Sequence, residues 1–118
     1  MSTNEKSAQL ARLQEQLRLI LSERQKLELE IKEADRVKQE VQSLSAGTEI
    51  YKSTGPVLYK TTPEEVVQGL DSYKAELTER LELYKTQEGA LKSEIERVRK
   101  SLVIQPRLDQ VQTDSEEE

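Results

Sequence analysis

Apolar residues recur every three or four positions in two long stretches of this chain. In the first, heptad positions a and d fall at residues 10, 13, 17, 20, 24, 27, 31, 34, 38 and 41, and only Arg24 and Lys38 interrupt the apolar series. In the second, the apolar positions are Val66, Leu70, Tyr73, Leu77, Leu81, Tyr84, Leu91, Ile95, Val98 and Leu102. A mean spacing near 3.5 residues is typical of a coiled coil. We therefore predict two long helices that pack along a narrow seam. The two successive four-residue steps from Tyr73 to Leu77 to Leu81 predict a stutter in the second helix.

A short strand pair over residues 48–60 separates the two stretches. Gly55-Pro56 supplies its turn, because glycine accepts a positive φ and proline cannot donate to a ladder. Gly47 is placed to end the first helix in the left-handed conformation. The run Thr62-Pro63-Glu64-Glu65 starts the second helix, with Thr62 as N-cap and Glu65 completing a capping box.

A helix, a hairpin and a returning helix require the two helices to lie antiparallel. The predicted fold class is mainly α: an antiparallel two-helix coiled-coil hairpin with one short β-hairpin at its base, contributing to an oligomeric β-barrel. We expect a single domain over residues 1–118, divided into a flexible N-terminus (1–9), a first helix (10–46), the β-hairpin (48–60), a second helix (62–104) and a disordered acidic tail (105–118).

The hairpin carries apolar side chains on both faces, which predicts a role in assembly. An isolated two-stranded ribbon is marginal in water, and its edges leave N–H and C=O groups unpaired. One face can cover the chain's own helices, so the other needs a neighbour. The alternative is a local cap that folds back onto those helices. The predicted oligomerisation residues are Ile50, Tyr51, Gly55, Val57, Leu58 and Tyr59.

A second candidate surface lies at the free end of the helices. Leu19 and Leu21 fall outside the seam, and antiparallel pairing brings Leu10 and Leu13 close to the region of Val98. Exposed apolar surface at a flexible tip can bind unfolded apolar segments of other proteins, although scattered surface leucines are also ordinary. The predicted client-binding residues are Leu10, Leu13, Leu17, Leu102, Val103 and Ile104.

Composition removes several functional classes. Cysteine and histidine are absent, so no disulfide, thiol nucleophile or histidine-based triad can form, and neither a metal nor a cofactor is expected. The carboxylates and lysines fall on solvated helical surfaces, so we expect no enzyme activity. The net charge of −5 is spread along the chain without a basic stripe, which argues against nucleic-acid binding. No apolar run is long enough for a membrane span, and we expect a cytoplasmic protein.

The hairpin and its flanks resemble a β-class subunit of prefoldin. The match lies in Ile50-Tyr51-Lys52, Gly55, Val57-Leu58-Tyr59-Lys60 and Thr61 to Val66. The segments 24–28 and 37–41 resemble the first helix of the sixth eukaryotic subunit type, whereas 61–65 is more similar to archaeal β subunits. Ser53 and Thr54 depart from the pattern, since the family usually has aliphatic residues there.

The resemblance implies a heterohexamer of two α-class and four β-class chains, with the hairpins in a central barrel and the coiled coils as tentacles. It also implies an ATP-independent co-chaperone that binds non-native polypeptides at the tentacle tips and transfers them to a group II chaperonin. The competing hypothesis is a coiled-coil structural adaptor that tethers folded partners without holding clients.

Overall fold

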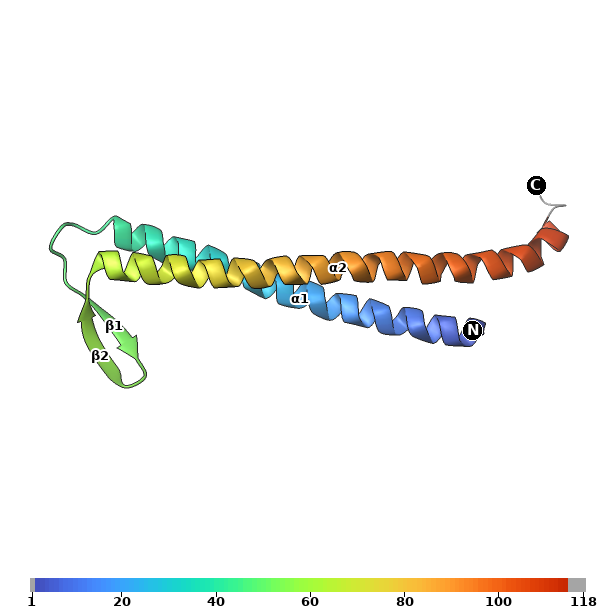
Figure 1. The fold of residues 1–118 in the computed structure, drawn as a ribbon, viewed down its shortest axis with the longest axis horizontal. Helices are drawn as coiled ribbons and strands as arrows, with labels where there is room; N and C mark the ends of the chain where they lie inside the picture. The colour runs from blue at the N-terminus through green and yellow to red at the C-terminus, as the bar shows by residue number, and fades with distance from the viewer. Residues whose placement is uncertain (1, 115–118) are drawn as a thin grey trace. The chain divides into compact units, whose positions relative to one another are not determined.

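The computed structural model describes residues 2–114, and the side chains of residues 2–102. Two long helices flank one β-hairpin in the order α1 (Thr3–Gln42), β1 (Ile50–Thr54), β2 (Val57–Thr61) and α2 (Pro63–Asp114) (Figure 1). The chain divides into two compact units, each described here by itself. The hairpin unit comprises residues 24–83, and the terminal unit comprises residues 1–23 and 84–118.

Helix α1 begins earlier than predicted, at Thr3 rather than Leu10. The Ser2 Oγ accepts a hydrogen bond from the Glu5 backbone N–H at 3.1 Å, and the Ser2 carbonyl accepts one from Lys6. Ser2 is therefore an N-cap, and Glu5 adds a negative charge to the first turn, where the helix dipole favours it.

Helix α1 also ends earlier than predicted, at Gln42, where Ser43 N–H donates to the Gln39 carbonyl at 3.1 Å. Gly47 has the positive φ expected of it, +84°, but it lies in a separate turn rather than at the helix end. That turn is closed by the Thr48 N–H, which donates to the Ser45 carbonyl. A positive φ at the third position of a four-residue turn is the type II geometry, which favours glycine there.

The start of α2 follows the prediction in part. Thr62 Oγ1 accepts from the Glu65 N–H at 3.2 Å, and Pro63 occupies the first helical position. The Glu65 carboxylate does not complete the box on Thr62 but accepts from the Thr61 hydroxyl at 2.9 Å. At its other end α2 continues through Pro106 to Asp114, beyond the predicted end at 104 and into the predicted tail. Proline removes one helical hydrogen bond and can kink a helix instead of ending it.

The hairpin has the predicted two-residue loop. Strands β1 and β2 are antiparallel, and Thr54 pairs with Val57 across Gly55-Pro56. Gly55 has φ +58°, and a positive φ at the first loop position followed by proline is the type II′ arrangement. One face carries Tyr51, Ser53, Leu58 and Lys60, and the other carries Ile50, Lys52, Thr54, Val57, Tyr59 and Thr61.

The seam of the hairpin unit is apolar at its buried positions and ionic nearer the hairpin. Leu27, Ala34, Leu77 and Leu81 are buried, and Leu77 is only 1% exposed. The Lys38 Nζ lies 2.7 Å from the Asp71 Oδ1, and Lys74 bonds to Asp35. Asp35 comes before Lys38 in α1, but its partner Lys74 comes after Asp71, the partner of Lys38, in α2. The helices of this unit therefore run antiparallel, as predicted.

The predicted stutter is wrong. In α2 an unbroken alternation of four- and three-residue steps joins half-buried or buried positions at 63, 67, 70, 74, 77, 81, 84, 88, 91, 95, 98 and 102, and residues 66, 94 and 101 beside this series are also half-buried. Tyr73 is 45% exposed, and its hydroxyl donates to Glu30 at 2.9 Å. Lys74 takes the seam position in its place, and its charge concealed the regular heptad in the sequence.

In the terminal unit, Ile95, Val98 and Glu88 are buried, and the Glu88 Oε2 lies 2.8 Å from the Lys92 Nζ. Segments around Gln9 and Val98 line one small cavity together. Antiparallel pairing of these segments agrees with the expected proximity of Leu10 and Val98.

The two ion pairs of the hairpin unit are reciprocal, since each helix carries an aspartate three residues before a lysine. We expect Asp71→Lys to lower the free energy of unfolding by about 1 kcal/mol, because it places two cations side by side in a partly exposed seam. The double variant Lys38→Asp with Asp71→Lys restores opposite charges and should recover most of that loss. Urea unfolding of the single and double variants measures both. If the double variant lost as much free energy of unfolding as the single variant, the pairing of Lys38 with Asp71 would be contradicted.

Candidate interaction surfaces

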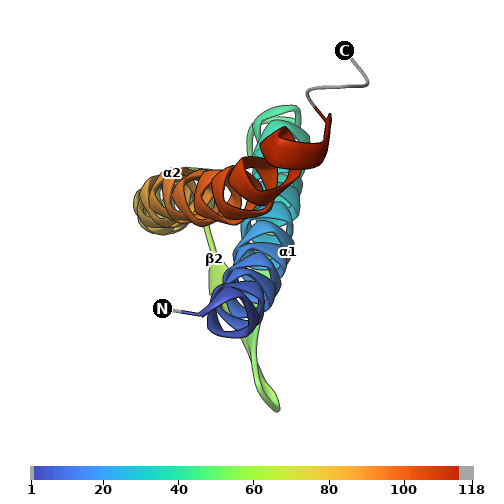
Figure 2. The same cartoon turned by 90° about the vertical axis from the view of Figure 1, so that its right-hand side faces the viewer.

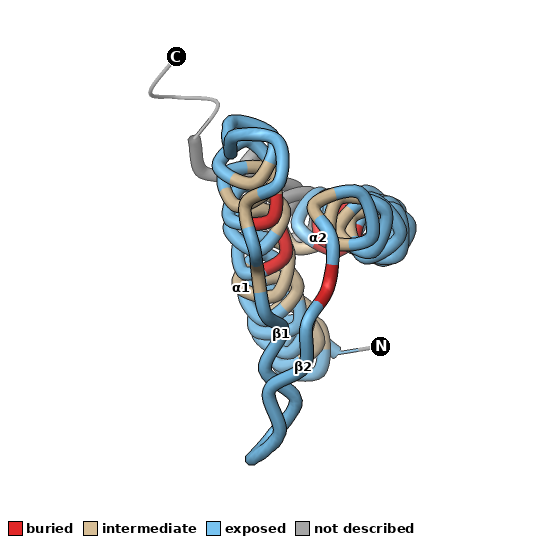
Figure 3. Tube along the Cα trace, turned by 90° about the vertical axis from the view of Figure 1, so that its left-hand side faces the viewer, coloured by how far each residue is buried: buried red, intermediate tan, exposed pale blue. Residues whose placement is uncertain are grey.

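The hairpin exposes apolar side chains on both of its faces. Tyr51 and Leu58 are 59% and 69% exposed on one face, and Val57 and Tyr59 are 57% and 45% exposed on the other. Ile50 is half-buried, and Thr61 at the end of β2 is buried. Figure 3 shows the largely exposed strands and the buried stretch where β2 leads into α2. Figures 1 and 2 show the hairpin projecting from the helix ends of the hairpin unit. We call the following six residues the hairpin surface: Ile50, Tyr51, Gly55, Val57, Leu58 and Tyr59.

A cavity of about 750 Å³ lies between the hairpin and the helices of the same unit. Its walls come from Ile50 and Tyr59 of the strands and from apolar residues of α1 and α2, including Val37, Val41, Val66 and Leu70. The strands therefore stand over a partly apolar hollow instead of packing closely on the helices.

One face of the hairpin carries a cluster of polar contacts around Glu49. The Glu49 carboxylate accepts from the Tyr51 hydroxyl at 3.2 Å and from the Lys60 ammonium at 3.3 Å. Tyr51 and Lys60 are cross-strand neighbours, so a single carboxylate ties both strands together at their base. These groups are exposed, and contacts of this kind add little stability.

The predicted client-binding residues occupy two different environments. Leu10, Leu13, Leu17 and Leu102 are half-buried along the seam of the terminal unit. The side chains of Val103 and Ile104 lie outside the described part of the chain. Leu19 and Leu21, in contrast, are 51% and 40% exposed on α1, outside the seam. In this unit they are the more accessible apolar groups.

A shallow apolar groove of about 430 Å³ adjoins Leu19. Its lining is contributed by Gln16, Leu19 and Ile20 of α1 and by Gln87, Ala90 and Leu91 of α2. The groove is not predictable from apolar periodicity, because Gln16, Gln87 and Ala90 carry no periodic signal. The available cue was that none of the six is charged in a chain with 35% charged residues.

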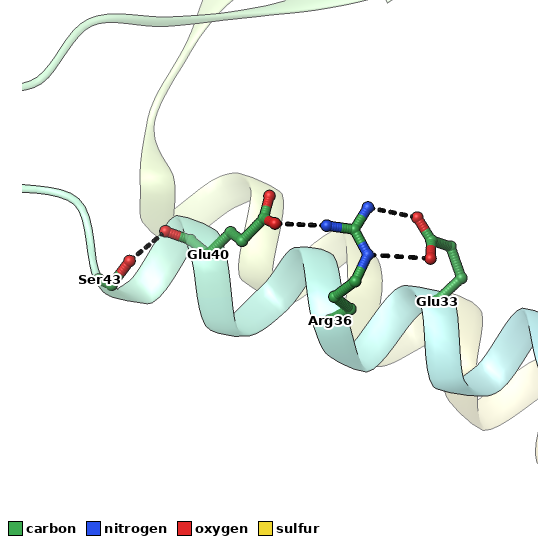
Figure 4. A network of polar contacts seen from close by, with 4 residues as sticks. All are labelled: Glu33, Arg36, Glu40 and Ser43. Carbon is green, nitrogen blue, oxygen red and sulfur yellow. Dashed lines mark hydrogen bonds and ion pairs between the residues drawn. The ribbon is translucent and has the colours of Figure 1, made fainter.

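The outer faces of the helices carry ion pairs between residues three or four positions apart. In Figure 4 the Arg36 guanidinium reaches Glu33, with Nε 3.0 Å from its Oε2, and also contacts Glu40. This hydrogen bond lowers the pKa of the Glu33 carboxyl and raises that of Arg36. Arg18 lowers the pKa of Glu15 in the same way. These groups are solvated, so the ion pairs stabilise the helices locally, and their pKa shifts create no acid–base site.

The described residues contain no cluster of acidic side chains able to hold a metal ion. Within the same residues, no helix combines the length and apolar character needed to span a bilayer.

Comparison with known proteins agrees with this geometry. Residues 4–107 match the prefoldin subunit family model. A prefoldin subunit beta of Sulfurisphaera tokodaii is 37% identical over 93 residues, covering 79% of this chain and 74% of the relative. The corresponding protein of Pyrococcus horikoshii is 32% identical, covering 74% of each.

Solved structures show the same fold. The crystal structure of the prefoldin beta subunit from Thermococcus strain KS-1 matches with a TM-score of 0.82 and 29% identity, covering 86% of this chain and 89% of that one. The beta2 subunit of the same strain has a TM-score of 0.68 and 24% identity, covering 77% and 97%, which supports the fold alone. These matches confirm the predicted arrangement of two long helices around a short antiparallel hairpin. On the family model and the aligned relatives, the chain belongs to the prefoldin subunit family.

Proposed function

We propose that this chain is a β-class subunit of an ATP-independent co-chaperone, a heterohexamer of two α-class and four β-class chains. In it, the hairpin surface joins neighbouring hairpins in a β-barrel, and the coiled coils hold non-native polypeptides at their tips before transfer to a group II chaperonin in the cytoplasm. The observation that carries this proposal is the hairpin of a prefoldin-family chain with large apolar residues exposed on both faces.

Assembly is supported by the physics of the hairpin. Two strands alone offer two open edges, and pairing with further strands satisfies those backbone groups. Neighbouring strands would also remove Leu58 and Val57, on opposite faces, from water. Such burial stabilises by about 25 cal/mol per Å² of apolar surface.

Client binding is supported by the leucines of the terminal unit. Leu19 and Leu21 are exposed, and Leu19 lines a groove whose lining is uncharged. A single small apolar groove binds weakly. When one assembly carries several such grooves, each bound groove raises the effective concentration of the client at the others. Weak individual contacts then add up to a higher overall affinity for an unfolded chain.

We expect the double variant Leu19→Ser and Leu21→Ser to lose most of its suppression of client aggregation, because the change removes accessible apolar surface from every copy of this chain. The assay follows light scattering of a chemically denatured client diluted into buffer with the assembled complex. The matched control is Leu29→Ser with Leu83→Ser, since these leucines are 60% and 61% exposed but belong to the hairpin unit. Equal suppression by both double variants would contradict the proposed client surface.

A further inference from the structure

The strands of the hairpin carry a charge opposite to that of the whole chain. The net charge of the chain is −5, yet β1 and β2 contain Lys52 and Lys60 and no acidic residue. The register places the two lysines on opposite faces, so each face of the hairpin presents one cation among apolar or hydroxyl side chains.

The two lysines differ in whether they have a partner. Lys60 lies 3.3 Å from the Glu49 carboxylate. Lys52 makes no hydrogen bond or ion pair with the described residues. It stands directly across from Tyr59, on the face that also carries Ile50 and Val57, and it lines the 750 Å³ cavity. The one carboxylate in that lining, Glu65, accepts a hydrogen bond from the Thr61 hydroxyl.

A neighbouring chain that covers this face removes the Lys52 ammonium from water and has to supply a partner for its charge. Taking an unpaired charge out of water is unfavourable, and a carboxylate placed opposite in good hydrogen-bonding geometry offsets part of that cost. In the free chain the ammonium is exposed to water, so it needs no partner until the face is covered. A lysine at the centre of an apolar interaction face therefore selects among neighbours.

A second copy of this chain is poorly suited to provide that carboxylate. The strands of a second copy carry no acidic residue, and the acidic residue next to them, Glu49, bonds to Lys60 and Tyr51.

We propose that the Lys52 face of the hairpin binds a different prefoldin-family subunit whose hairpin presents a carboxylate opposite Lys52. This inference rests on the proposed assembly through the hairpin and adds the charge that selects the neighbour. Lys52 is then a specificity-determining residue, and the apolar residues around it supply complementary surface.

The test uses the full chain and its complex purified from the source cells, dissociated and remixed. Native mass spectrometry measures the binding of the unmodified chain, Lys52→Met, Lys52→Glu and Lys32→Glu to the separated partner chains. Lys52→Met leaves the partner carboxylate unpaired, so binding should weaken roughly 30-fold or more. Lys52→Glu should weaken it further. Lys32→Glu changes the net charge equally at an exposed site on α1 and should bind like the unmodified chain. Circular dichroism of each variant checks that the helices remain folded.

The outcomes separate this inference from the function on which it rests. If the unmodified chain binds no other prefoldin-family chain, the proposed assembly itself fails. If it does bind one, and Lys52→Met binds equally well or better, no carboxylate faces Lys52 and only this inference is overturned. Assembly of the unmodified chain with further copies of itself, as tightly as with the partner, would also overturn it.

A second arm needs no partner chain. The Lys52→Glu variant carries an acid on the strands, where the unmodified chain has none. In an equimolar mixture, unmodified and Lys52→Glu chains should therefore form a larger proportion of mixed dimers than random pairing gives. A statistical distribution of dimers would count against charge selection at this face.

Discussion

Leu77→Ala is expected to lower the free energy of unfolding of the chain by about 2–5 kcal/mol, the usual cost of truncating a fully buried leucine. The Leu77 side chain is 1% exposed and lies in the seam of the hairpin unit, four residues before Leu81. The substitution removes apolar contact and leaves a cavity that the two helices cannot close without shifting their backbones. A seam of two helices has few buried positions, so each carries a large share of the stability.

The matched control is Leu83→Ala, the same change on the same helix and in the same unit. Leu83 is 61% exposed, so its truncation removes little packing, and its effect should stay within about 0.5 kcal/mol. Urea unfolding followed by far-ultraviolet circular dichroism at one fixed chain concentration compares the two. Equal midpoints for Leu77→Ala and Leu83→Ala would mean that the seam is not where the structure places it.

The seam positions of α1 could be predicted more accurately than those of α2 for a physical reason. All ten predicted seam positions of α1, including the charged Arg24 and Lys38, are buried or half-buried. The apolar seam residues before and after Arg24 and Lys38 fix the phase of the heptad repeat across these charged positions. In α2 the exposed Tyr73 lies next to the half-buried Lys74, and hydrophobicity alone chooses the tyrosine. Lys74 occupies the seam because Asp35 on α1 pairs with it, and that contact is set by the fold.

The element ends were predictable where a local hydrogen bond defines them. Thr62 is predictable as the cap of α2 because apolar periodicity follows it directly. The similar signal at Ser2, followed three residues later by Glu5, stands apart from the apolar periodicity, which begins only at Leu10. The hairpin turn was also predictable, since Gly55-Pro56 restricts the choice of turn. The cavity under the hairpin and the groove beside Leu19 were not predictable, because they depend on how separate segments pack.

Leu58→Asp is expected to abolish assembly through the hairpin, with binding to neighbouring subunits weakened about 100-fold or more. Leu58 is 69% exposed near the start of β2, on the face opposite Lys52. If neighbouring strands bury this face, the new carboxylate loses its water without gaining a dedicated partner, because the nearby Lys60 is held by Glu49. Removing one member of a buried charge pair commonly costs 3–5 kcal/mol, and an unpaired carboxylate introduced here should cost a similar amount.

The matched control is Leu29→Asp, which changes the charge equally on α1 of the same unit at a leucine that is 60% exposed. Both variants should keep their helices, since neither leucine lies in the seam. Native mass spectrometry of each variant mixed with the partner subunits then isolates the role of the hairpin. Intact complexes with Leu58→Asp would show that this face stays open to solvent in the assembly. Loss of complexes with both variants would instead point to the overall charge, and the hairpin would no longer be the assigned site of assembly.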